Sequence, residues 1–128
     1  DTPIMEALRL INRTGYSQIP IYDSGAYQAL LTTNVIARWV AADLGDDGVV
    51  NAASISAVLE FAEKKDRAEF LPRNASAQEV IDALTEPAAD GTHPSAVLLT
   101  EQGKPSQRPL AIATPADLAV LVDALEWE

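Results

Sequence analysis

Thr114 and Asp117 are the residues whose types and spacing most directly suggest chemistry. They lie in LAIATPADLAVLV, residues 110–122, where an apolar strand runs straight into an apolar helix. Threonine at the N-cap, proline at the first helical position and an acid at the third form a helix-capping arrangement. Alternatively, the carboxylate of Asp117 faces a ligand. These residues alone leave both explanations open.

Other residues with catalytic potential are few, which weighs against an enzyme. The 128-residue chain has no cysteine and one histidine, His93, which is expected in a polar loop before an apolar run. The sequence offers His93 no nucleophile or orienting partner, and it has no glycine-rich phosphate loop or metal-ligand spacing. We therefore predict no catalytic residue, no metal site and no required cofactor.

Composition limits the class of protein. Apolar residues make up 48% of the chain, enough for one ordinary core or for two small units that share one. No apolar run approaches the roughly 20 residues that a membrane helix needs, and no signal peptide opens the chain. The net charge of −10 weighs against nucleic-acid binding, because phosphate recognition needs a basic face. The lack of cysteine fits a reducing, cytoplasmic setting.

Helix and strand signals follow one another along the chain. Apolar residues at helical spacing predict helices in TPIMEALRLINRTG, TNVIARWVAADLG, SISAVLEFAEKK, SAQEVIDALTEP and PADLAVLVDALEW. Short apolar runs bounded by turn residues predict strands in SQIPIY, AYQALLT, AEFLP, SAVLLT and RPLAIAT.

Some side chains can be placed from these elements. Ser76, followed three residues later by Glu79, predicts a capping box at the start of a helix. Trp39 and Trp127 are expected to make core or dimer contacts. Arg38 and the charged patch EKKDR, residues 63–67, are expected on the solvated surface.

The order helix–strand–strand–helix occurs twice, which indicates an internal duplication. Overlaying SQIPIYDSGAYQALLTTNVIARWV on PSAVLLTEQGKPSQRPLAIATPADLAVLV aligns Thr32 with Thr114 and Val35 with Asp117. The second hairpin is five residues longer than the first. Two units that are each too small to bury their own apolar face would pack against each other.

This pattern resembles a tandem pair of cystathionine β-synthase (CBS) domains, which are regulatory modules with the order β-α-β-β-α. The stretches TGYSQIPIYDSGAYQALLTTNVIARWV and AVLLTEQGKPSQRPLAIATPADL look like the family's Pro-Val-Val-Asp strand, its turn and its Thr-x-x-Asp ending. The segment TTNVIARWV is similar to stand-alone bacterial pairs.

The resemblance implies an α/β fold in which two pseudo-symmetric repeats pack sheet to sheet. We expect a first repeat at residues 1–45, a linker with a short helix at 46–66 and a second repeat at 67–128. The strand AEFLP opens the second repeat, whereas the first repeat starts on its helix at Asp1, so we expect it to lack its opening strand.

The resemblance also implies ligand sites in the clefts between the repeats, where an adenosine-containing ligand places its ribose hydroxyls on the motif's aspartate. A vicinal diol offers two donors and a carboxylate two acceptors, so the pair can be bidentate. The diol would bind at Thr114 and Asp117, and the phosphate side at Ser17 and Gln18. Tyr16 would stack on the base or merely pack beside a helix cap.

The base itself would lie against backbone around four further positions, Leu71, Arg73, Pro94 and Ser95.

Two features limit the choice of ligand. Val35 replaces the acid in the first-repeat cleft, so we predict that this cleft binds no ribose. Because Ser17 and Gln18 are uncharged, AMP, an S-adenosyl compound or a cyclic dinucleotide fits better than ATP.

Two functions of different class therefore remain. One is a regulatory module that senses an adenosine-containing ligand: AMP, ADP, ATP, S-adenosylmethionine or cyclic di-AMP. The other is a ligand-free module that dimerises or binds protein through helices rich in alanine, leucine and valine. The resemblance implies a homodimer, and an effector protein is expected to carry the output, with no nucleic-acid or membrane partner.

Overall fold

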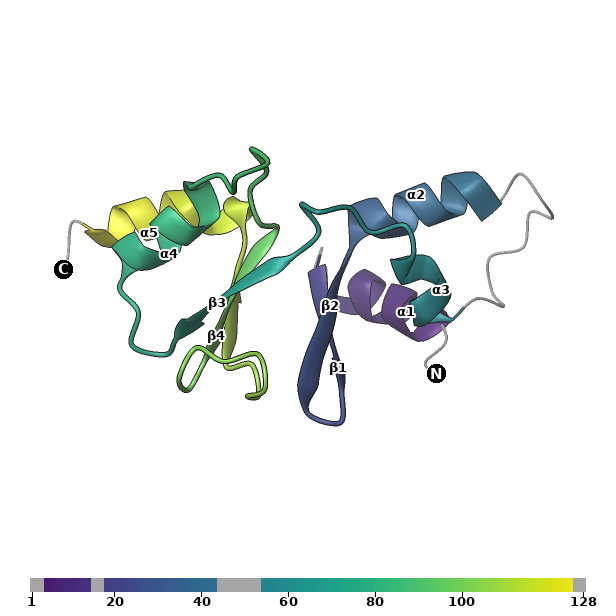
Figure 1. Ribbon diagram of the computed structural model, residues 1–128, viewed down its shortest axis with the longest axis horizontal. Helices are drawn as coiled ribbons and strands as arrows, with labels where there is room; N and C mark the ends of the chain where they lie inside the picture. Colours follow the sequence, from purple (N-terminus) through teal and green to yellow (C-terminus); the bar gives the residue numbers. More distant parts are fainter. Residues whose placement is uncertain (1–3, 15–17, 44–53, 126–128) are drawn as a thin grey trace.

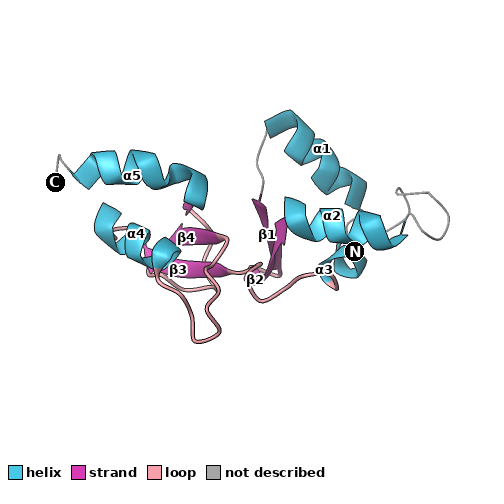
Figure 2. Cartoon of the chain, turned by 90° about the horizontal axis from the view of Figure 1, so that it is seen from above, coloured by secondary structure: helices cyan, strands magenta, loops and turns pink. Residues whose placement is uncertain are grey.

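The computed structural model describes residues 4–14, 18–43 and 54–125. The chain has a mixed α/β fold with two small sheets. We call residues 4–66 the first half and residues 67–125 the second half. In both views the strands lie between the helices of the first half and those of the second (Figures 1 and 2).

The first half consists of a β-hairpin covered by helices. Its strands β1 and β2 pair antiparallel from Gln18↔Thr32 to Asp23↔Ala26. Ser24 and Gly25 link them with φ values of 53° and 81°, as a two-residue hairpin turn requires. Its elements are α1 (Ile4–Thr14), β1 (Gln18–Asp23), β2 (Ala26–Thr32), α2 (Thr33–Asp43) and α3 (Ile55–Leu59).

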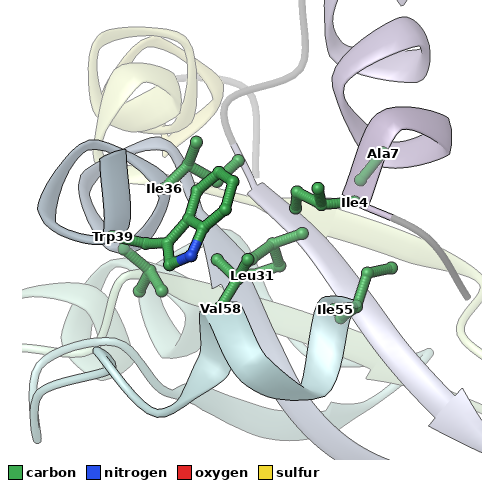
Figure 3. Close-up of a cluster of buried hydrophobic side chains, with 8 residues drawn as sticks. Ile4, Ala7, Leu31, Ile36, Trp39, Ile55 and Val58 are labelled. Atoms are coloured by element: carbon green, nitrogen blue, oxygen red, sulfur yellow. The ribbon is translucent and has the colours of Figure 1, made fainter. Parts of the chain in front are cut away.

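The core of the first half joins segments that are far apart in the sequence. Leu31 from β2, Trp39 from α2 and Val58 from α3 meet beside Ile4 of α1 (Figure 3). Trp39 is 4% exposed, which confirms its predicted core position. Because α3 contributes to this core, that part of the predicted linker packs with the first half; residues 46–53 lie outside the described residues.

The second half is a three-stranded sheet with two helices. Strand β3 pairs parallel with β4, and β4 pairs antiparallel with β5. Val80 and Leu84 of α4 are buried with Val97 of β4, and Leu118 of α5 packs against them. The elements are β3 (Ala68–Pro72), α4 (Ala77–Thr85), β4 (Ala96–Thr100), β5 (Ala111–Ala113), the 3₁₀ turn η1 (Pro115–Asp117) and α5 (Leu118–Ala124).

Helix α4 begins at the predicted capping box. The backbone N–H of Glu79 donates to Ser76 Oγ at 3.1 Å, and the N–H of Ser76 donates to Glu79 Oε1 at 3.1 Å. Each bond satisfies an N–H group that has no partner within the helix.

The helix–strand–strand–helix order is present in both halves, as α1-β1-β2-α2 and α4-β4-β5-α5. The second half also has β3 beside β4, whereas in the described part of the first half β2 is the only strand paired with β1. Among the residues described, no helix has the length and apolar character to cross a bilayer.

Three predicted elements are shorter or different in type. The helix expected in SISAVLEFAEKK covers only Ile55–Leu59, and the strand expected in RPLAIAT covers only Ala111–Ala113. The last helix begins with a 3₁₀ turn at Pro115–Asp117. After Leu59 the backbone forms tighter turns, in which the N–H groups of Phe61 and Ala62 donate to the carbonyls three residues earlier. The Phe61 carbonyl accepts a hydrogen bond from Arg38.

Candidate functional site

A groove of about 460 Å³ lies between the two halves. Its volume is within the range of small-molecule sites. Among the lining residues that the structure describes, Gln18 is the one with a polar side chain, and none is charged. The first half contributes Leu10, Gln18, Ile19 and Pro20, and the second half contributes Leu98, Pro109, Leu110, Ala111 and Ile112.

The groove walls expose apolar side chains. Leu110 is 45% exposed and Ile112 is 38% exposed, although both are large aliphatic residues. A ligand that covers them would gain about 25 cal/mol for each Å² of apolar surface removed from water. These walls suit a flat, weakly polar ring. The described wall residues carry no charge, and the role of Gln18 on the phosphate side stays a prediction.

A larger hollow of about 720 Å³ lies within the first half, between the hairpin and α3. Its lining residues include Ile21, Gln28 and Leu59, and all of them come from the first half. None of the sequence-predicted site residues that the structure describes lines it. The smaller groove is therefore the better candidate, since both halves build it.

Thr114 and Asp117 lie at the end of β5, directly beyond the groove wall. Asp117 Oδ2 accepts a hydrogen bond from the Thr114 N–H at 2.8 Å and one from the Thr114 hydroxyl at 3.5 Å. The Asp117 N–H in turn donates to the Thr114 carbonyl at 2.8 Å. Asp117 is half-buried, and its Oδ1 accepts no hydrogen bond from the residues described. The acid therefore caps the turn with one oxygen while the other stays available.

The groove and the Asp117 turn are close along the chain. Thr114 follows Ile112 by two residues, or about 7 Å of extended strand. A nucleoside is long enough to reach from the groove wall to this turn.

No family model matches the chain. A search of curated proteins finds no significant similarity either. Within the described ranges, no group of three or more histidine, cysteine, aspartate or glutamate side chains is placed to hold a metal ion. The site must therefore be judged from its own geometry.

The structure does not bring all the predicted base-contacting residues together. Ser95 stands at the start of β4, where its N–H donates to the Arg67 carbonyl at 2.9 Å, and Pro94 before it is buried. Leu71 and Arg73 lie four and six residues beyond Arg67, about 13 to 20 Å away at about 3.3 Å per residue. One base cannot touch both ends of this sheet.

The sheet register shows which end belongs with Asp117. Val97 pairs with Ala113, so Thr114 lies near the start of β4 and near Ser95. Leu71 packs against the core of the second half, and the exposed Arg73 side chain pairs with Glu101 at 3.3 Å. β3 thus carries both residues to the end of the sheet opposite Thr114, and their contact with a base stays a prediction. The predicted residues Tyr16 and Ser17 lie outside the described residues.

Asp66 forms a buried polar cluster that the sequence prediction missed. Its side chain is 1% exposed, accepts a hydrogen bond from the Thr32 hydroxyl at 2.9 Å and pairs with Arg38. Arg38 also donates Nε–H to the Phe61 carbonyl at 2.9 Å. The predicted surface positions of Arg38 and of this part of EKKDR were wrong. The sequence held one signal of this cluster. Thr32 aligns with Thr114 but has no acid three residues later, so another acid could be its partner.

Tyr27 of β2 contacts the second half through its backbone and its ring. Its N–H donates to the Pro105 carbonyl at 3.1 Å, and its ring meets Phe70 edge to face, with centroids 5.0 Å apart. Burial raises the pKa of the Tyr27 hydroxyl, while a hydrogen bond from the Ala68 backbone lowers it to a smaller extent. Burial also raises the pKa of Tyr22, whose hydroxyl oxygen is buried with no partner among the described residues.

Proposed function

We propose that the protein is a regulatory ligand-sensing module that binds an adenosine-containing ligand in the groove between its halves. The observation that carries this proposal is that both halves line a groove close to Asp117, whose carboxylate uses only one of its two oxygens in the cap. A ligand held there contacts both halves, so it stabilises whichever arrangement of the halves it fits better. That differential affinity would be the signal passed to an effector protein.

The same proposal assigns the two halves as CBS repeats that pack sheet to sheet. The repeated helix–strand–strand–helix order and the position of the strands between the helix layers support this assignment (Figure 2). The cap at Thr114 supports a functional Thr-x-x-Asp turn, because it orients the carboxylate before a ligand arrives.

The groove favours an adenosine ligand with little negative charge. The base would lie against Leu110 and Ile112, and the ribose hydroxyls would donate to Oδ1 of Asp117. The described wall residues include no cation, and the chain has a net charge of −10, so a polyphosphate would be repelled. AMP or an S-adenosyl compound therefore fits better than ATP.

Replacing Asp117 with asparagine tests the diol contact. Asp117→Asn keeps the size of the side chain but removes its charge, so we expect roughly tenfold weaker binding of adenosine or S-adenosylmethionine. Isothermal titration would measure both, beside AMP, ADP, ATP and cyclic di-AMP. We expect 2′,3′-dideoxyadenosine, which has no diol, to bind wild type and variant equally.

Asp123→Asn is the matched control, because Asp123 is an exposed acid on α5. It removes the same charge away from the groove and should leave affinity unchanged. If every adenosine compound fails to bind the wild type, the ligand-sensing proposal is wrong.

The surface of α5 favours a second candidate function, which is self-association without a ligand. Val120 is 71% exposed and Val122 is 54% exposed. The two valines are two positions apart on the helix and face different sides of it, so Val120, the more exposed, is the centre of this candidate contact surface. The helix would then pair with the same helix of a second copy.

Val120→Lys tests this alternative. A lysine in an apolar contact leaves a buried charge unpaired, so we expect sedimentation velocity to show a wild-type dimer and a monomeric variant. Asn12→Lys, on an exposed position of α1, is the control and should not change the sedimentation coefficient. A monomeric wild type at high concentration would exclude dimerisation through α5.

A further inference from the structure

We propose that Asp66 is a positioning residue that fixes the second half of the protein onto the first. It does so by supplying, from the connector (residues 60–67), the carboxylate that the strand-to-helix turn of the first half lacks. This inference does not depend on a ligand. It concerns how the groove walls are held relative to each other.

The turn after β2 is built like the turn after β5, with one substitution. Thr32 and Thr114 each end the second strand of a hairpin and each precede a helical turn. The Val35 N–H donates to Thr32 Oγ1 at 3.1 Å, so Thr32 caps α2. The Val35 side chain is fully buried in the core and cannot accept a hydrogen bond from the threonine hydroxyl.

Asp66 provides the acid that Val35 cannot. The Thr32 hydroxyl donates to Asp66 Oδ1 at 2.9 Å across 34 residues of sequence. At the corresponding turn of the second half, Asp117 is the partner of Thr114 and lies three residues away. The threonine hydroxyl thus binds a nearby carboxylate in the second half and a carboxylate distant in the sequence in the first half.

Asp66 is held from several sides. The Glu63 N–H donates to Asp66 Oδ2 at 2.8 Å, which closes a turn of the connector. Arg38 of α2 pairs with the same oxygen, and its Nη1 lies 3.6 Å from Glu63 Oε1. A carboxylate this deeply buried is stable only when it is paired and hydrogen-bonded, so the cluster must form as a unit.

Arg67, the next residue along the chain, forms hydrogen bonds within the second half. Arg67 Nη1 donates to Thr92 Oγ1 at 2.9 Å, and its Nη2 donates to the Thr92 carbonyl at 3.2 Å. The Arg67 carbonyl accepts the Ser95 N–H at 2.9 Å. Adjacent residues are about 3.8 Å apart between Cα atoms. Asp66 binds the first half and Arg67 binds the second. The connector therefore has no free residue between these two contacts that could let the halves move apart.

A distance measurement between the halves tests the proposal. The chain has no cysteine, so Asn12→Cys on α1 and Ala119→Cys on α5 give one exposed spin-label site in each half. We expect a narrow distance distribution by double electron–electron resonance for this pair. Asp66→Asn removes the charge but keeps the shape, and we expect it to broaden or shift the distribution.

Ser76→Ala separates a positioning role from a loss of stability. It removes the cap of α4 within the second half and should lower the melting temperature by about 4 °C. The distance distribution should nevertheless stay as narrow as that of the wild type. Asp66→Ala should lower the melting temperature by about 10 °C. If the alanine variant does not fold, the melting temperature of Asp66→Asn is measured in its place.

Arg38→Gln provides an independent check. It removes the partner of Asp66 from α2, so it should broaden the distribution as Asp66→Asn does, and the double variant should add little. Unchanged distributions in Asp66→Asn and Arg38→Gln would overturn the proposal, whatever their melting temperatures. Failure of adenosine compounds to bind would leave this result untouched.

Discussion

Trp39→Ala is expected to remove about 3 to 5 kcal/mol from the free energy of unfolding. Trp39 is 4% exposed and belongs to the buried cluster that joins α1, β2, α2 and α3 (Figure 3). Truncating it removes apolar burial and leaves a cavity among residues from four elements, which cannot collapse together without moving the hairpin. Because domains of this size have unfolding free energies of about 5 to 15 kcal/mol, this loss would be a large share of the whole stability.

Urea denaturation followed by far-ultraviolet circular dichroism would measure this loss. Trp39→Phe is the matched control, since phenylalanine refills most of the space and should cost less than half as much. Equal losses for the two variants would show that the indole edge is required for more than filling volume. A loss of less than about 1 kcal/mol in Trp39→Ala would contradict the core position.

Gly103→Ala is expected to cost about 2 kcal/mol or more of unfolding free energy. Gly103 has a φ of +76°, which strains any residue with a Cβ. An added Cβ would also lie 3.0 Å from the Pro72 nitrogen and 3.2 Å from the Leu71 carbonyl carbon. Those atoms are backbone at the end of β3, so they cannot move aside cheaply.

Gly25→Ala is the control that the chain itself provides. Gly25 has a similar φ of +81°, but an added Cβ would meet nothing within 4 Å. It should therefore lose only about 1 to 2 kcal/mol, the cost of the left-handed backbone. The difference between the two variants in urea denaturation isolates the close approach at Gly103. If the two losses were equal, steric contact with β3 would not contribute.

The Gly103 loop is also the part of the second hairpin that reaches the first half. Within it, the Lys104 N–H donates to Thr100 Oγ1 at 2.8 Å, and the Thr100 hydroxyl donates to Gln107 Oε1 at 3.1 Å. These bonds hold Pro105 where its carbonyl accepts the Tyr27 N–H. Displacing the loop in Gly103→Ala should therefore weaken the contact between the halves as well.

Local features of the fold could be predicted from the sequence because short-range chemistry determines them. The Ser76–Glu79 capping box and the Ser24–Gly25 turn depend on residues within four positions of each other. The repeated element order was likewise visible in the spacing of apolar residues. The lengths were less accurate, because contacts with distant residues also act at the ends of elements, as the bond from Arg38 to the Phe61 carbonyl does after α3.

The long-range features could not be predicted in the same way. Asp66 is 28 residues from Arg38 and lies in a charged stretch that looks like exposed surface. Only the folded chain shows that its charge is needed at Thr32. The positions of Leu71 and Arg73 are a related case. Sequence spacing shows that they lie at the end of a strand, but not that Asp117 lies at the other end of the sheet.

The hairpin of the first half has a consequence for how the protein behaves in concentrated solution. In the part of the chain that the structure describes, β1 pairs with β2 alone, so one side of this strand is open to another polypeptide. Such open sides are common starting points for aggregation. Pro20 lies in the middle of β1 and brings no N–H group. Since sheets accept proline where its missing donor points away from the neighbouring strand, Pro20 interrupts the row of donors that a foreign strand would need.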